Sequence, residues 1–517
     1  MKTLEQILQD YEPVIGLEVH TELTTLNTKM FCSCKLEFGA APNSHTCPVC
    51  LGLPGALPVP NKAAIEEIVL AGLATNCDIE KDSMFYRKNY MYPDMSKNFQ
   101  TTQGPIAFCM RGHLDLDIDA RSASQRFDIS DDERKNGYTR RIGITRIHME
   151  EDAGKMNHVG GGEGRIAGAT HSLVDYNRCG TPLIELVTEP ELRTPAEARA
   201  FMQKLRQIYL VLGISDCSME EGSLRCDGNV SLRRRGTQEF GTKTELKNMN
   251  SFKNLHDGLM YEICRQAQVL DEGGTIYQET RHWDPSVKRT IVMRVKESAD
   301  DYRLFPCPDL APYHLTDEFI NGIASRLPEL PDARATRFMQ DFELSKYDAS
   351  HLIEHRATAN FFESCMVQGA KDSTNTAQFA KAVANFIIND ISAYSNANPD
   401  FNLENGNLKA EYMCDIVSLL LKDTLSSKQA REVLLEVIKT GDNPDAIVKA
   451  KGLGQVSDTA EIEAIVDAVL AANPAKVDEY KGGKVGLIGF FVGQCMKEMK
   501  GSGNPKLINE ILASKLN

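Results

Sequence analysis

The sequence has 517 residues, a net charge of −14 at pH 7 and 42% apolar residues. No apolar run approaches the roughly 20 residues that a membrane-spanning helix needs, and 14 scattered cysteines do not predict a disulfide scaffold. The length predicts two to four domains. The excess of acidic residues argues against a protein that binds nucleic acids non-specifically over its whole surface, although local basic patches could still bind one folded RNA. The first ten residues resemble neither a signal sequence nor a transit peptide, so we expect a cytoplasmic protein that is not bound to a membrane.

The first predicted strand, residues 13–22, alternates apolar and polar side chains (Pro-Val-Ile-Gly-Leu-Glu-Val-His-Thr-Glu). Period two puts Glu18, His20 and Glu22 on one face and the apolar side chains on the other. One solvated face is usual in antiparallel sheets, so a surface strand is one interpretation. The other is a site for a hard cation or a phosphate, because buried acids need a counter-charge.

Four cysteines follow closely, in the pairs Cys32-Ser-Cys34 and Cys47-Pro-Val-Cys50, with a 12-residue loop between them. Two such knuckles match the tetrahedral thiolate set of a zinc site better than a redox pair in a cytosolic protein. Because protein ligands would fill all four positions, we expect this zinc to be structural and bound to a loop of the first domain.

Two further strands repeat the polar pattern of residues 13–22. In the segment 141–155, alternation places His148 and Glu150 on one face, together with Arg146 and Asp152. In the run 183–187 (Leu-Ile-Glu-Leu-Val), Glu185 is a lone acid in a strand otherwise suited to burial. Such a carboxylate must be protonated, paired or bound to a metal. Structural ion pairs would explain each strand alone, but three strands together favour a shared site for Mg²⁺ or Mn²⁺.

The remaining pattern divides the chain into three predicted domains. Residues 1–295 are β-rich and loop-rich, 296–405 are helical, and 406–517 form a small all-helical tail. The fold class we expect is therefore α+β. A basic run, Ser231-Leu-Arg-Arg-Arg-Gly236, is followed by Lys243, Lys247 and Lys253, and a solvated loop is its simplest interpretation.

Several long motifs resemble the B subunit of the bacterial tRNA-dependent amidotransferases, the GatB family. The matching stretches are Val14-Ile-Gly-Leu-Glu-Val-His20, Arg87-Lys-Asn-Tyr-Met-Tyr-Pro-Asp94, His148-Met-Glu-Glu-Asp-Ala-Gly-Lys155, Asp175-Tyr-Asn-Arg178 with Glu185, residues 219–227, 245–251, 301–303 with 308–309, and the tail segment 486–497. Together they cover essentially the whole chain.

The resemblance implies a cradle-shaped catalytic domain that uses ATP to phosphorylate the side-chain carboxylate of a misacylated tRNA, either Glu-tRNA(Gln) or Asp-tRNA(Asn). Ammonia from a glutaminase A subunit would then give the amide, and a small C subunit would complete a heterotrimer. It also implies that Glu18, His20, Glu150 and Glu185 hold Mg²⁺. Lys88 and Arg178 are candidates for phosphate contacts, and structural salt bridges are the alternative for both.

The resemblance also gives the tail a role in tRNA binding, with Lys484, Lys497 and Lys500 as candidate phosphate contacts. The chain has no Gly-Gly-Ser-Ser-Gly-Gly amidase signature, so we expect it to depend on a partner for ammonia. Two other hypotheses stay open, a non-catalytic zinc-containing RNA-binding scaffold and a small-molecule ligase. Which of the two charged tRNAs is the substrate does not follow from the sequence.

Overall fold

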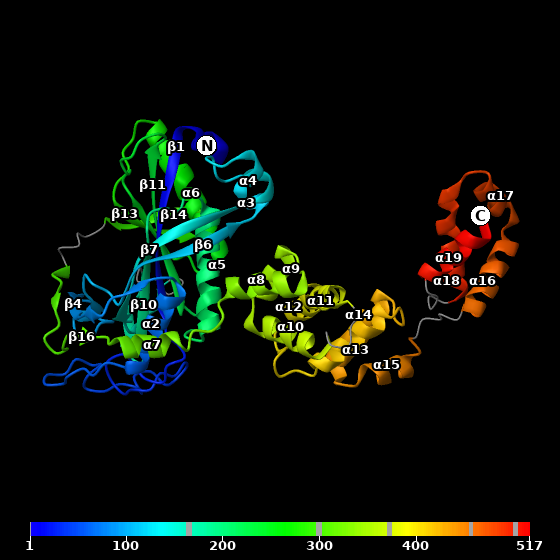
Figure 1. The fold of residues 1–517 in the computed structure, drawn as a ribbon. Coiled ribbons are helices and arrows are strands. Elements are labelled where there is room, and N and C mark those ends of the chain that lie inside the picture. The colour runs from blue at the N-terminus through cyan, green and yellow to red at the C-terminus, as the bar shows by residue number, and fades with distance from the viewer. Residues whose placement is uncertain are drawn as a thin grey trace. The chain divides into compact units, whose positions relative to one another are not determined.

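The computed structural model (Figure 1) describes residues 2–161, 168–295, 302–369, 375–453, 459–499 and 505–516. The chain divides into two compact units, residues 1–330 and 331–517. Two residues of the sequence predictions lie outside the described residues: Asp301, in the matched segment 301–303, and Lys500, in the tail. Across the described ranges, no helix combines the length and apolar character that crossing a bilayer requires.

A large mixed sheet dominates the first unit. Among the described residues it has twelve strands, ordered β14-β13-β12-β11-β1-β10-β7-β5-β4-β15, with β6 paired to β7 and β2 paired to β6. The strands are β1 (Tyr11–Glu22), β2 (Asp78–Ile79), β4 (Phe85–Asn89), β5 (Phe99–Gln103), β6 (Cys109–Ile118), β7 (Tyr138–Glu151), β10 (Pro182–Thr188), β11 (Leu224–Arg234), β12 (Thr244–Lys247), β13 (Glu279–Asp284), β14 (Arg289–Val295) and β15 (Phe305–Pro306). Figure 1 shows β1, in blue, between strands that come much later in the chain.

The two faces of this sheet differ in polarity, as the alternation in β1 predicts. Ile15, Leu17 and Val19 are fully buried in the core of the unit. The polar side chains of β1 lie on the opposite face and are half-buried. The same holds in β7, where Ile147 and Met149 join the core while the intervening polar residues lie on the other face.

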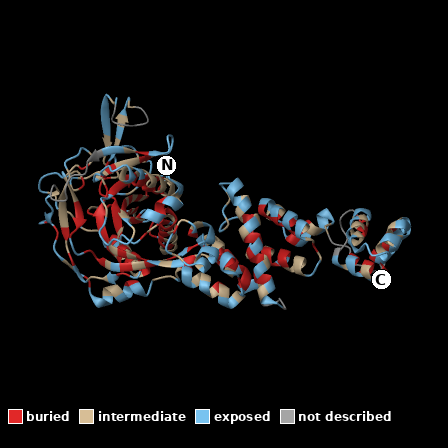
Figure 2. Ribbon diagram, turned by 90° about the horizontal axis from the view of Figure 1, so that it is seen from above, coloured by how far each residue is buried: buried red, intermediate tan, exposed pale blue. Residues whose placement is uncertain are grey.

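Helices cover the apolar face of the sheet and supply the rest of its core, which forms the dense group of buried residues in Figure 2. The helices of this unit are α1 (Leu4–Asp10), α2 (Lys62–Ala74), α3 (Ala120–Ala123), α4 (Asp131–Asn136), α5 (Pro195–Leu212), α6 (Phe252–Asp271) and α7 (Asp317–Ala324). Helix α5 begins where the Thr194 side chain accepts a hydrogen bond from the Glu197 backbone N–H, and it ends at Gly213 in a left-handed conformation. Pro195 at the first helical position is typical of such a start.

Two short strand pairs stand apart from the large sheet. They are β3 (Asp82–Ser83) with β16 (Tyr313–His314), and β8 (Lys155–Val159) with β9 (His171–Asp175). The residues from 302 to 314, for which the sequence pattern predicts helix, instead contribute β15 and β16 to the first unit. Hydrogen bonding to β4 and β3 decides their conformation, and a pattern taken from one short segment cannot include such distant partners.

The second unit is helical throughout its described residues. Its elements are α8 (Pro331–Phe342), α9 (Lys346–Leu352), α10 (Arg356–Gly369), α11 (Thr376–Asn385), the π-helix η3 (Phe386–Ile391), α12 (Ser392–Ala397), α13 (Ala410–Leu421), α14 (Ser427–Thr440), α15 (Pro444–Lys451), α16 (Thr459–Ala472), α17 (Pro474–Lys481), η4 (Val485–Leu487), α18 (Ile488–Glu498) and α19 (Pro505–Leu516). One buried apolar cluster extends from Phe338 to Ile447 and another from Ile462 to Leu516. With the β-rich first unit, this arrangement confirms the α+β prediction.

Candidate functional site

The strand register brings the three polar segments of the sequence together on one face of the sheet. Across β1, β10 and β7, His20 is paired with Glu185, and Glu185 is paired with His148. Glu150 lies two residues beyond His148 and therefore on the same face. Paired residues of neighbouring strands project to the same side, so these four side chains are adjacent although they are up to 165 residues apart in sequence, from 20 to 185.

His20, Glu150 and Glu185 form a cluster whose potential ligand atoms all lie within 4.8 Å of one another. His20 Nε2 is 3.3 Å from Glu185 Oε2 and 3.9 Å from Glu150 Oε1. On the other side, His148 Nε2 is 3.5 Å from Glu185 Oε2 and 3.8 Å from Glu150 Oε2. Two carboxylates with one or two imidazoles provide a donor set that suits Mg²⁺ or Mn²⁺.

In this cluster, the imidazoles and the carboxylates shift one another's pKa against the effect of burial. Burial alone would lower the pKa of His148, but the Glu185 and Glu150 carboxylates outweigh it and raise that pKa to about 9. His20 responds in the same direction, since Glu185 and Glu150 raise its pKa against the effect of burial. Burial would raise the pKa of Glu185, but the two imidazoles hold it well below its ordinary value. Glu185 therefore stays ionised in the interior.

These shifts predict a pH dependence of stability in buffer free of divalent cations. Because the pKa of His148 is about 9 in the folded chain against an ordinary 6.5, its stabilisation is complete below pH 6.5. That stabilisation, up to about 3 kcal/mol, is lost as the pH rises through 9. Thermal unfolding midpoints from pH 6.5 to 9.5 should fall in the wild type and fall less in His148→Gln. Equal slopes for the two proteins would contradict this account.

Glu18, the fourth residue expected at the cation, is not part of the cluster. It lies on the same face but opposite Asp227, and its Oε1 accepts a hydrogen bond from Asn229 Nδ2 at 2.9 Å. Glu18 also lines a cavity of about 290 Å³ between β1, β10 and β11. The cavity is bounded further by Thr188, Ser231, Phe240 and the exposed Lys243, so both polar and apolar side chains line it.

Lys88 and Arg178 have different surroundings. The β4–β5–β7 register puts Lys88 on the same face as Glu150, and its Nζ lies 4.9 Å from the centre of the Tyr302 ring. Arg178 donates from Nε to Glu22 Oε1 at 3.0 Å and from Nη2 to Asp152 Oδ2 at 2.5 Å. Arg178 is thus tied to acids of the polar face, whereas Lys88 rests on an aromatic ring.

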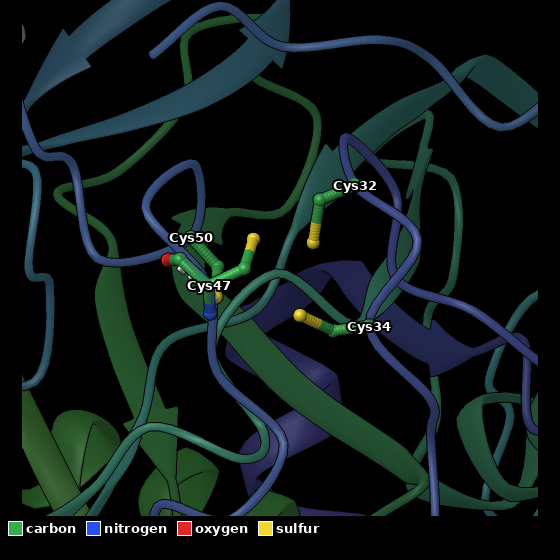
Figure 3. A group of neighbouring side chains, drawn as sticks. All are labelled: Cys32, Cys34, Cys47 and Cys50. Carbon is green, nitrogen blue, oxygen red and sulfur yellow. Dashed lines mark hydrogen bonds between the residues drawn. The ribbon is translucent and has the colours of Figure 1, made fainter.

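The four cysteines predicted as a metal site also converge. The Sγ atoms of Cys32, Cys34, Cys47 and Cys50 lie within 4.8 Å of one another and point toward a common centre (Figure 3). The hydrogen bond from Cys32 lowers the pKa of the Cys50 thiol to about 4, which favours a thiolate at this centre. The Lys29 N–H donates to Cys34 O at 3.0 Å, and Ser96 Oγ donates to Cys50 O at 2.6 Å, so both knuckles are anchored to the unit.

Three of the six basic residues singled out from the sequence pair with acids in the first unit. Arg233 Nε is 2.6 Å from Glu12, Lys247 pairs with Asp227, and Lys253 pairs with Asp257. In the second unit, Lys484 and Lys497 are exposed, and Lys484 Nζ is 3.0 Å from Glu479 Oε2. A run of basic residues therefore did not identify a free basic surface in the first unit.

One residue next to the cluster, Arg225, is not recognisable from the sequence as a site residue, whereas His148 is indicated by its place beside Glu150 in a polar strand. Arg225 of β11 lies in a motif without an assigned role. Arg225 is paired with His20 across β11 and β1, which puts both arginine and imidazole in one row. Only the register of a strand more than 200 residues away could have indicated this position.

Comparison with known proteins adds an independent result. The family model described as the GatB/GatE catalytic domain matches residues 13–321, and the one described as the GatB domain matches residues 360–516. The B subunit of the aspartyl/glutamyl-tRNA(Asn/Gln) amidotransferase of Carboxydothermus hydrogenoformans is 49% identical over 98% of this chain and 99% of its own length. Proteins of the same name from Geobacter sp. (strain M21) and Brevibacillus brevis are 48% and 45% identical over 98% and 99% of this chain, and over 99% and 100% of their own lengths. The resemblance in the motifs is thus confirmed, and the chain belongs to the GatB family of amidotransferase B subunits.

Proposed function

We propose that the chain phosphorylates the side-chain carboxylate of Glu-tRNA(Gln), Asp-tRNA(Asn) or both with ATP, and then directs ammonia onto the activated acyl group. The names of its relatives support tRNA-dependent amidation of these substrates. The cluster of His20, Glu150 and Glu185 on a sheltered sheet face is the observation that supports the phosphorylation step most directly. The scaffold hypothesis is not favoured by this family membership.

The chemistry explains why two steps are needed. A carboxylate is a poor electrophile because its leaving group would be oxide. Its oxygen therefore attacks the γ-phosphorus, the bond between that phosphorus and the bridging oxygen breaks, and ADP leaves with the electron pair. Ammonia then attacks the acyl carbon, the bond between this carbon and the phosphate oxygen breaks, and inorganic phosphate leaves. The nitrogen that was added loses one proton to solvent and becomes the amide.

Each site residue has a proposed part in this scheme. His20, Glu150 and Glu185 would hold Mg²⁺, which neutralises charge on the transferring phosphoryl group when it is bound, and Glu18, which faces Asn229, is left out of this ligand set. His148 would orient the two carboxylates from the opposite side, since its Nε2 is 3.5 Å from Glu185. Lys88 and Arg178 would contact phosphate oxygens. The first unit, residues 1–330, would be the catalytic cradle, and the helical domain and the tRNA-binding tail would lie in the second unit, residues 331–517.

The name of the relatives, which identifies them as one subunit of an enzyme, supports an assembly with other chains. We propose a cytoplasmic heterotrimer with a glutaminase A subunit, which supplies ammonia, and a small C subunit. The tail lysines Lys484 and Lys497 would contact tRNA phosphates, and so would Lys500, which lies outside the described residues. Such contacts would make tRNA binding weaken with rising salt.

The four-cysteine centre is proposed to hold structural Zn²⁺. Stripping the zinc with a strong chelator should speed amide hydrogen exchange in residues 27–61, because both knuckles and their anchors then lose their common centre. Zinc release would be counted with a chromophoric chelator. Mg²⁺ affinity should stay within about twofold of its value in the zinc-loaded protein, since the cation cluster lies on β1, β7 and β10 and not on the cysteine loop. Loss of Mg²⁺ binding with the fold intact would contradict the separation of the two sites.

The experiment that tests the function is ADP release by the chain co-expressed with its A and C subunits, with and without misacylated tRNA. Wild type and Glu150→Gln would be compared. Turnover that requires Glu-tRNA(Gln) or Asp-tRNA(Asn) and disappears in Glu150→Gln is the expected result. A folded, tRNA-bound complex without tRNA-dependent turnover would instead support the scaffold hypothesis.

A further inference from the structure

Beside the cation cluster, two arginines meet on one buried carboxylate. Arg178 Nη2 and Arg225 Nη2 each lie 2.5 Å from Asp152 Oδ2. The Arg178 guanidinium also contacts Glu22 Oε1 through Nε and Nη2. The side chain of Asp152 is only 7% exposed, whereas those of Arg178 and Arg225 are 34% and 40% exposed. The acids are therefore the inner part of this group and the guanidinium edges are its outer part.

The register fixes where this arginine pair lies. Arg225 is paired with His20, which is itself paired with Glu185, so arginine, imidazole and carboxylate lie in one row across β11, β1 and β10. Asp152 follows Glu150 by two residues, just after the end of β7. The arginine pair thus borders the candidate cation cluster on the polar face of the sheet.

The arginines retain hydrogen-bond donors that no described protein group accepts. Arg225 Nε is buried without a partner. For the Nη1 atoms of both arginines, the described part of the chain provides no acceptor within hydrogen-bonding distance. A purely structural ion network would be expected to pair the buried Arg225 Nε, because an unsatisfied buried donor is unfavourable. The partly exposed guanidinium edges, which are held by the acids behind them, are suited to bind an anion of fixed position.

We propose that Arg178 and Arg225 form an anion clamp for the phosphoryl group in transfer, with Asp152 and Glu22 as positioning residues; this rests on the function proposed above. The clamp binds the phosphoryl oxygens while the oxygen–phosphorus bond to the substrate carboxylate forms and the bond to the ADP oxygen breaks. Arg225 thereby becomes a catalytic residue that was not recognised from the sequence. Arg178 binds the phosphoryl group together with Arg225, in addition to Lys88. The same phosphate chemistry could come from the backbone of the tRNA, and the test separates the two sources.

The test compares wild type, Arg225→Gln, Arg225→Lys and Asp152→Asn in the complex with its partner subunits. The matched control is Arg141→Gln, which removes another arginine–aspartate pair, Arg141–Asp115, from an exposed part of the sheet. The readouts are kcat and KM for ATP at saturating misacylated tRNA, tRNA affinity without ATP, and the thermal unfolding midpoint.

The clamp predicts that Arg225→Gln and Asp152→Asn lower kcat about 100-fold, with KM for ATP and tRNA affinity within about threefold. Arg225→Lys keeps the charge and protects the fold, and it should lower kcat about 10-fold because it cannot bind two oxygens at once. Arg141→Gln should match the wild type. A rise in the tRNA dissociation constant with kcat unchanged would overturn the assignment in favour of the RNA backbone.

A lower unfolding midpoint with unchanged kcat would make the arginine pair structural and would overturn the clamp. If Arg225→Gln does not fold, Arg225→Lys decides, and wild-type kcat in that variant also overturns the clamp. A wild-type complex without tRNA-dependent ADP release would overturn the proposed function together with the clamp. An active wild type with equally active arginine variants would overturn the clamp alone.

Discussion

Replacing Glu185 by glutamine is expected to lower tRNA-dependent ADP release at least about 1,000-fold while the chain stays folded. The change keeps the size of the side chain but removes the charge that faces both imidazoles, at 3.3 Å from His20 and 3.5 Å from His148. A neutral amide is a poor ligand for a hard cation, and loss of about 4 kcal/mol of transition-state stabilisation corresponds to this factor. If the chain were a non-catalytic scaffold, the same substitution would leave its function unchanged.

The measurement is ADP release by the purified complex with Glu-tRNA(Gln) and Asp-tRNA(Asn), alongside the unfolding midpoint. Glu189→Gln is the matched control, because Glu189 follows the same strand but accepts a hydrogen bond from Thr145 Oγ1 at 2.8 Å instead of facing the cluster. Near-wild-type turnover is expected for this control. Turnover of Glu185→Gln within tenfold of wild type would show that the acids of the sheet do not support phosphorylation.

The polar face of the sheet could be predicted from local alternation. Within β1, the period of two separates the fully buried Ile15 and Leu17 from His20 without any knowledge of the neighbouring strands. Glu185 was recognisable because it is the single acid in an apolar run, and an acid in such a strand needs a partner. These signals belong to single segments, and single segments are sufficient to find candidate residues.

The set of partners around each candidate could not be predicted in the same way. Arg225 joins the row of His20 only through the β1–β11 register, and Glu18 faces Asn229 rather than the cluster for the same reason. The arginine-rich run at 233–235 is another case. Arg233 is paired with Glu12, and Arg235 stacks on Phe127, with its guanidinium carbon 4.0 Å from the ring centre. Pairing across distant segments decides whether a charge is available, and the sequence contains no local record of it.

A second large effect concerns stability rather than catalysis. Glu197 is fully buried at the start of α5, where its carboxylate faces Arg126. Glu197 Oε1 accepts a hydrogen bond from Tyr138 Oη at 2.9 Å, and Oε2 accepts one from the Arg193 N–H at 2.7 Å. Replacement by alanine leaves the buried Arg126 without this counter-charge and removes the acceptor for the other two groups. We expect a loss of about 3–5 kcal/mol in the free energy of unfolding.

The chain provides its own probe for this loss, because Trp283 is its only tryptophan and is buried in the core of the first unit. Urea unfolding followed by Trp283 fluorescence therefore reports on the unit that contains Glu197. Glu133→Ala is the matched control, since Glu133 occupies the corresponding third position of α4 but is only half-buried. A much smaller shift is expected there, because water replaces the lost contacts. Equal shifts for the two variants would mean that helix capping alone, and not the buried ion pair, makes Glu197 important. A shift confined to Glu197→Ala would identify the contact of α5 with Arg126 as a main source of stability beneath the catalytic sheet.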